Sequence, residues 1–138
     1  HVKHLQFVFI SHIHADHHLG LVHILSIRSF YSSLSPLLII GPVSVQKWLG
    51  ELPYIHNSYH FIPVHLFLHP TSPHLLQQER EGDDRQDRES LRREKERVFE
   101  GGISFLQAVR VPHCHDSFAL VFSLSPSIGQ GDRMKIVY

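Results

Sequence analysis

Cysteine is nearly absent from this sequence, which has a single thiol, at Cys114. One thiol excludes an intramolecular disulfide and any zinc site built from several thiolates of the chain. Such cysteine usage favours a reducing, intracellular compartment. Long apolar runs are absent too: no stretch of 18 or more apolar residues occurs, so the sequence predicts no membrane-spanning helix.

An excess of one charge is also lacking, because 13 Lys and Arg residues balance 13 Asp and Glu residues. This balance gives no global attraction to a polyanion. Much of the charge lies in residues 79–100, which hold nine acidic and seven basic side chains. We predict that residues 75–102 form a charged surface insertion, because so polar a segment cannot bury enough apolar surface to join a core. Its later half is typical of a solvated helix or of a disordered segment.

Apolar residues make up 42% of the 138 residues and include nine Phe, which is enough for a hydrophobic core. Their spacing predicts an α/β fold, with strands and helices alternating at the start of the chain. Strands are expected at residues 5–10 and 37–40, and helices at residues 19–30 and 43–49. Residues 53–74, with four prolines, fit an edge strand or an irregular connection. Three further strands are expected at residues 103–111, 118–124 and 134–138.

Histidine is the compositional outlier, with 14 copies, and several lie in a His-x-His-x-Asp-His pattern directly after the first predicted strand. In extended backbone His12 and His14 fall on one side, where both imidazoles could reach one cation. Asp16 and His17 lie just beyond and could turn toward a second cation. Two zinc ions about 3.5 to 4 Å apart can hold a hydroxide and clamp both oxygens of a phosphoryl displacement. The pattern therefore indicates metal-dependent hydrolysis.

The alternative interpretation of this motif is a surface histidine cluster that binds no metal. Three His and one Asp at these offsets arise by chance with a probability of roughly 1% in a chain of this composition, which favours the metal site. His18 and His23 are expected to be ordinary residues at the start and on the face of the following helix.

A mononuclear zinc site needs at least three protein ligands, and the motif offers two good ones for the first ion. The third is predicted to be His113, which follows a later strand. Cys114 is a softer alternative ligand at the same place. His115 and Asp116 are either groups that orient the ligands or plain loop residues, and the sequence leaves both open.

Two stretches, FVFISHIHADHHLGL and VPHCHDSFALVF, resemble motifs of the long-form ribonuclease Z group in the metallo-β-lactamase superfamily. PLLIIGP and the terminal MKIVY are similar to that family as well. The resemblance implies a partial metallo-β-lactamase αββα sandwich over residues 1–138, interrupted by the charged insertion. It also implies a zinc-dependent endonuclease that removes 3′ trailers from precursor tRNA, located in the nucleus, the mitochondrion or both, with no membrane partner and no small-molecule cofactor.

Carried over residue by residue, the resemblance implies that His12, His14 and His113 bind one zinc ion. It implies that Asp16 and His17 bind a second zinc ion, and that Asp16 also accepts a proton during catalysis. Members of the short form carry a tRNA-gripping arm after the third histidine. Only a hairpin-sized stretch follows His113 here, which favours the long form.

Two features depart from the family pattern: the bridging Asp and the final His ligand are not found before Tyr138, and Ala119 stands where many relatives have Gly. We therefore expect a fragment of a larger protein, and a poor enzyme when isolated. Two other functions remain open. One is a related hydrolase acting on a thioester or on another RNA, and the other is a non-catalytic remnant that binds metal or RNA.

Overall fold

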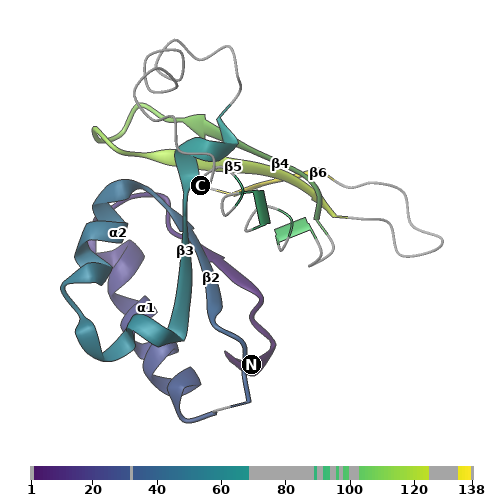
Figure 1. Ribbon diagram of the computed structural model, residues 1–138. Coiled ribbons are helices and arrows are strands. Elements are labelled where there is room, and N and C mark those ends of the chain that lie inside the picture. The colour runs from purple at the N-terminus through teal and green to yellow at the C-terminus, as the bar shows by residue number, and fades with distance from the viewer. Residues whose placement is uncertain are drawn as a thin grey trace. The chain divides into compact units, whose positions relative to one another are not determined.

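The computed structural model describes residues 2–31, 33–68, 89, 92, 93, 96, 98, 99, 103–124 and 134–137. The chain forms two compact units (Figure 1). The first consists of His1–Val64 and Arg110–Phe118, and the second of His65–Val109 and Ala119–Tyr138. Among the described residues, no helix combines the length and the apolar character that crossing a bilayer requires.

The first unit is a parallel three-stranded sheet with helices on one side (Figure 1). Its elements are η1 (Val2–His4), β1 (Phe7–Phe9), α1 (Ala15–Ser29), β2 (Leu37–Gly41), α2 (Val43–Gly50), η2 (Pro53–Ser58) and β3 (Tyr59–Pro63). The strand order is β1-β2-β3, and both pairings are parallel. The predicted alternation of strands and helices is therefore confirmed, and β3, which lies in the proline-containing stretch, is at an edge of the sheet that the described residues form.

Strand β2 lies at the centre of this sheet, and all five of its residues are buried. A parallel strand whose residues are all buried is expected to be a continuous apolar run, as LLII is. The side chains of α1 and α2 that reach the core, Leu25, Val45 and Leu49, are each 0% exposed, as is Ile39 of β2. Burying such side chains contributes about 1.5–3 kcal/mol each, so this cluster holds the helices on the sheet.

Helix α1 begins four residues earlier than the sequence predicts, at Ala15 instead of residue 19. Strand β1 is correspondingly shorter than the expected strand at residues 5–10. Asp16 and His17, which precede the helix predicted at residues 19–30, therefore lie in the first turn of α1. An acidic residue is favourable there, since the amino-terminal end of a helix carries a partial positive charge.

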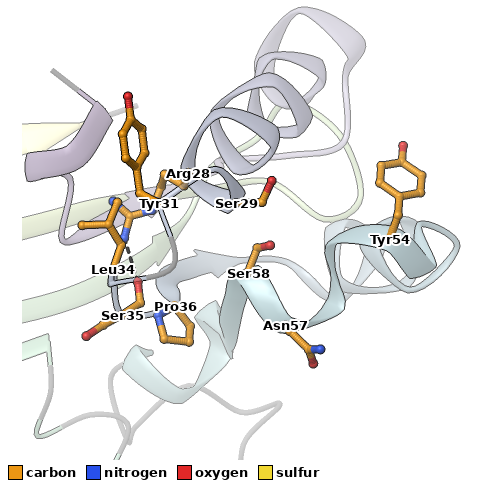
Figure 2. A pocket seen from close by; sticks show the side chains of 9 residues that line it. All are labelled: Arg28, Ser29, Tyr31, Leu34, Ser35, Pro36, Tyr54, Asn57 and Ser58. Atoms are coloured by element: carbon orange, nitrogen blue, oxygen red, sulfur yellow. Dashed lines mark hydrogen bonds between the residues drawn. The ribbon is translucent and has the colours of Figure 1, made fainter.

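Arg28 fixes the carboxyl-terminal end of α1, and its side chain is only 7% exposed. Its guanidinium donates hydrogen bonds to the carbonyl oxygens of Val2 at 2.9 Å, Leu5 at 3.3 Å and Ser35 at 2.8 Å. Figure 2 shows the bond to Ser35. Both residues line a cavity of about 320 Å³. The remaining residues that line it are Ser29, Tyr31, Leu34, Pro36, Tyr54, Asn57 and Ser58. The three carbonyl acceptors offset the cost of burying the Arg28 charge. In turn, the guanidinium holds the backbone of Val2, Leu5 and Ser35 in place.

The second unit contains η3 (Val64–Phe67), β4 (Ile103–Arg110), β5 (Phe118–Leu124) and β6 (Met134–Val137). The strand order is β4-β5-β6, and β5 pairs with β6 in the antiparallel direction. The hydroxyls of Ser104 and Ser123 share a hydrogen bond of 2.7 Å. The three strands predicted from the sequence are confirmed, with β4 one residue shorter than expected, while the last residue of the third predicted strand, Tyr138, lies outside the described residues.

The predicted insertion at residues 75–102 lies largely outside the described residues, and its status as an insertion stays a prediction. The described residues of its later half are helical. Arg92 and Glu96 form an exposed ion pair of 3.1 Å, whereas Val98 is only 1% exposed. A solvated helix that buries one apolar residue fits this part of the segment.

Candidate metal centre

The first two candidate ligands lie where β1 leads into α1, at the carboxyl end of a parallel strand. Ligand sites of α/β proteins gather at this edge. The Ser11 hydroxyl lies 2.8 Å from Nδ1 of His12, so this contact orients the ring with Nε2 toward His14. His14 is the N-cap of α1, with extended backbone (φ −68°, ψ 141°). His12 and His14 are thus two positions apart in extended chain, and Nε2 of His12 lies 3.1 Å from Nδ1 of His14.

The third candidate ligand lies in the connection between β4 and β5, residues 111–117, which we call the His113 loop. The backbone N–H of Val111 donates to the carbonyl oxygen of Ser117 at 3.2 Å, which closes the loop at its base. The N–H of Phe118 donates to the carbonyl oxygen of Ser11 at 3.0 Å. This bond fastens the end of the loop beside the residue that precedes His12.

The structure brings the rings of His12, His14 and His113 together. One nitrogen of each lies within 4.8 Å of the others. The ring centroid of His113 is 4.7 Å from that of His12 and 5.1 Å from that of His14. Two nitrogens bound tetrahedrally to zinc lie about 3.3 Å apart, given bonds of about 2.0–2.1 Å, so a small closure of the rings would complete the geometry. Three imidazoles at this spacing fit a zinc ion, and their role as ligands stays a prediction.

Asp16 and His17 lie at the rim of this cluster. The His17 ring centroid is 4.1 Å from that of His12, and its Nε2 is 3.6 Å from Oδ2 of Asp16. The Asp16 side chain is 82% exposed and that of His17 is 42% exposed. Among the described residues, the group close enough to share one ion contains His12, His14 and His113 but neither of these two. Their binding of a second ion therefore stays a prediction.

The environment of the cluster favours the neutral form of its buried ring, that of His12. Burial lowers the pKa of His12 below its usual 6.5, and positive charge on His17, His14 and His113 lowers that pKa further. The carboxylate of Asp16 opposes these effects and raises the pKa of His12. A neutral imidazole offers a lone pair, which is the form that a metal ion requires.

The other histidines of α1 differ in environment. His18 is 6% exposed, donates from Nδ1 to the carbonyl oxygen of His14 at 2.9 Å, and meets the ring of Trp48 edge-on at 4.3 Å between centroids. His23 is exposed. Both lie within α1, as predicted. The sequence did not reveal that His18 braces the backbone of a candidate ligand.

The other polar residues of the His113 loop differ in their contacts. Oδ2 of Asp116 accepts hydrogen bonds from the backbone N–H of Ser44 at 3.3 Å and from its hydroxyl at 2.9 Å. Sγ of Cys114 lies 2.7 Å from the hydroxyl of Ser117, and His115 is exposed. Sequence reasoning missed Ser44 altogether. Gly41-Pro42 indicates that a helix starts near Ser44, but nothing local indicates a partner 72 residues away.

No protein-family model matches the chain. Its sequence is 25% identical over 142 residues to the mitochondrial ribonuclease Z of Drosophila melanogaster. This match covers 99% of this chain and 16% of that protein. It is 37% identical over 68 residues to zinc phosphodiesterase ELAC protein 2 of Rattus norvegicus, covering 46% of this chain and 8% of that protein. Over 58 residues it is 38% identical to the ribonuclease Z of Limosilactobacillus reuteri (strain DSM 20016), covering 42% of this chain and 19% of that protein.

Among solved structures, a long form RNase Z from yeast resembles the chain with a TM-score of 0.70 and 19% sequence identity. The match covers 98% of this chain and 20% of that chain. This similarity confirms the predicted α/β fold of the metallo-β-lactamase type. The chain spans less than a fifth of the length of each of the three sequence relatives and a fifth of the yeast protein.

Proposed function

We propose that this chain, a homologue of the ribonuclease Z proteins, forms part of the catalytic centre of a zinc-dependent endoribonuclease that removes 3′ trailers from precursor tRNA. The observation that carries the proposal is the convergence of His12, His14 and His113, whose nitrogens lie within 4.8 Å of one another. Similarity to proteins named ribonuclease Z and zinc phosphodiesterase supports both the metal and the reaction class.

Each residue of the cluster has a distinct part in this proposal. His12, oriented by the Ser11 hydroxyl, would hold the first zinc ion together with His14 and His113. His17 and Asp16 would hold a second ion at the rim. When bound, zinc would supply Lewis acidity that stabilises negative charge on the phosphodiester. Asp16 would accept a proton at a carboxylate oxygen, which is 3.6 Å from His17 and open to solvent.

The location of the protein in the cell follows the same proposal. A relative from Drosophila melanogaster is named a mitochondrial ribonuclease Z, which supports a mitochondrial location. A nuclear location stays a prediction from the family resemblance.

The test of the function compares cleavage by the full-length natural protein with cleavage by two variants, His12→Ala and His23→Ala. The substrate is a precursor tRNA with a 3′ trailer, supplied with zinc. The wild type should release the trailer and leave a 3′-hydroxyl on the tRNA. His12→Ala should abolish cleavage, whereas His23→Ala should not, because His23 is exposed on α1 outside the cluster. Circular dichroism should show that both variants fold.

Two results would contradict the proposal. One is cleavage by His12→Ala at the wild-type rate. The other is a wild-type protein that binds zinc and hydrolyses a thioester but leaves precursor tRNA intact, which would favour the related hydrolase instead.

A further inference from the structure

The His113 loop carries a candidate ligand but has little apolar packing of its own. Pro112, His113 and His115 are all exposed. The backbone bond from Phe118 to Ser11 fastens the end of the loop, five residues beyond His113. Among the described residues, the pair of bonds between Ser44 and Asp116 is the one side-chain hydrogen-bond link from the loop to another segment. Within the loop, the N–H of His113 donates to the carbonyl oxygen of Val111 at 3.0 Å, so the backbone next to His113 is fixed locally. The position of the loop as a whole depends on the Phe118 bond and on how Asp116 is held.

Asp116 accepts a hydrogen bond from a backbone N–H group in the first turn of helix α2. The N-cap of α2 is Pro42, and no side chain of the cap position forms a hydrogen bond to the helix. The N–H groups in the first turn of a helix lack partners within the helix and favour a negative charge nearby. Pro42 offers its carbonyl oxygen to the N–H groups of Val45 at 3.0 Å and Gln46 at 3.3 Å. The N–H of Ser44 is satisfied instead by the Asp116 carboxylate.

The same contact joins the His113 loop to the first turn of α2. Ser44 is the second residue of α2, which begins two residues after β2, the central strand of the sheet, whose five residues are all buried. This anchor is rigid, because β2 is hydrogen-bonded on both sides and shares a packed core cluster with Val45 and Leu49 of α2. The hydroxyl bond of 2.9 Å and the backbone bond of 3.3 Å converge on one oxygen of Asp116. A charged acceptor makes both bonds stronger than neutral ones.

We propose that Asp116 and Ser44 are positioning residues for the metal centre: their hydrogen bonds hold the His113 loop so that the His113 ring faces His12 and His14. Neither residue needs to touch the metal or the substrate. The inference rests on the proposed function for its catalytic meaning. The position of the ring, however, can be measured without metal and without activity.

The first experiment measures ring position in the metal-free, histidine-labelled full-length natural protein by NMR. Wild type should show a nuclear Overhauser effect between the rings of His12 and His113, whose centroids are 4.7 Å apart. Asp116→Ala should lose this signal, because both bonds from Ser44 are removed. Asp116→Asn should keep it, since the amide oxygen can still accept both bonds. His115→Ala is the matched control in the same loop and should keep the signal.

The second experiment measures zinc affinity of the same variants by competition with a chromophoric chelator. Asp116→Ala should bind zinc about 10- to 100-fold more weakly, as is typical when a group that orients a ligand is lost. Ser44→Ala removes the hydroxyl bond but keeps the backbone bond, so its affinity should fall between those of Asp116→Ala and wild type. Asp116→Asn and His115→Ala should match wild type. The thermal unfolding temperature of each variant is the control: an unchanged temperature shows that a loss of zinc affinity comes from a displaced His113 ring and not from a destabilised fold.

Failure of this inference differs from failure of the proposed function. If Asp116→Ala and Ser44→Ala both keep the ring contact and full zinc affinity, the positioning role is refuted, while cleavage by the wild type would still support the enzyme. If the ring contact is lost in Asp116→Ala and kept in Asp116→Asn, but the wild type cleaves no precursor tRNA, the positioning role stands and the proposed function does not.

Discussion

Replacing Asp16 by Asn would remove one negative charge from the rim of the histidine cluster while nearly preserving the shape of the side chain. The stability of the fold should fall only slightly, because the Asp16 side chain is 82% exposed and its contact with His17 is 3.6 Å long. An exposed ion pair contributes about 0.2–1 kcal/mol, and an acid in the first turn of a helix contributes about 0.3–1 kcal/mol. The free energy of unfolding should therefore fall by about 1 kcal/mol.

Catalysis should suffer far more than stability. A general acid or base contributes about 100- to 10,000-fold to a rate, so we expect cleavage of precursor tRNA to fall at least about 100-fold. That factor corresponds to about 2.7 kcal/mol in the activation free energy. The first zinc ion should remain, because Asp16 does not belong to the group formed by His12, His14 and His113. Affinity for tRNA should change little, since it arises mainly from phosphate contacts spread over basic side chains.

Single-turnover cleavage, tRNA affinity and zinc content should be measured on one preparation of the full-length natural protein carrying Asp16→Asn. Glu51→Gln is the matched control, because it removes an exposed carboxylate at the end of α2, which is outside the cluster. Near-normal cleavage by Asp16→Asn would eliminate Asp16 as the proton acceptor and as an essential ligand. Unfolding or complete loss of zinc would show instead that its role is structural.

Other expectations follow from the same structure. His113→Ala should weaken zinc binding by more than about 100-fold in a chelator competition, since the three histidines would share a binding free energy of about 10–16 kcal/mol; unchanged affinity would remove His113 from the site. The lowered pKa of His12 stabilises the metal-free fold above pH 6.5, and this contribution is lost as the pH falls through the lower folded-state pKa. Urea unfolding across this range should show the loss in wild type, and His12→Gln should show a shallower dependence. Leu25→Ala, at a position 0% exposed in the core, should cost about 2–5 kcal/mol by the same method. Deleting residues 79–100 should leave the zinc content unchanged, and loss of all zinc would contradict the predicted surface insertion.

Local sequence patterns sufficed for most of the secondary structure. The run at residues 37–40 is apolar throughout, and it forms the buried central strand β2 because a strand covered on both faces tolerates no polar side. The start of α1 could not be predicted as well. The histidine-rich segment before Leu19 has no apolar spacing of its own, so its helical first turn depends on tertiary contacts such as the packing of His18 against Trp48.

Burial of individual histidines was also beyond the sequence. His18 and His23 lie on the same helix, yet His18 is 6% exposed and packs against Trp48, whereas His23 is exposed. Five residues turn a helix by about 140° beyond a full circle, so these two side chains point to nearly opposite sides. Which side faces the core depends on the sheet and on α2, and no local pattern specifies it.

The sequence by itself determined the donor set of the candidate site: a His-x-His-x-Asp-His motif after a strand, and a further histidine in a later loop. Only the tertiary structure decided that His113 meets His12 and His14, and that Asp116 is held by Ser44. The physical reason is one of range. Side-chain alternation and helix periodicity act over a few residues, whereas a hydrogen bond between positions 72 residues apart exists only after the core has brought two strand ends together.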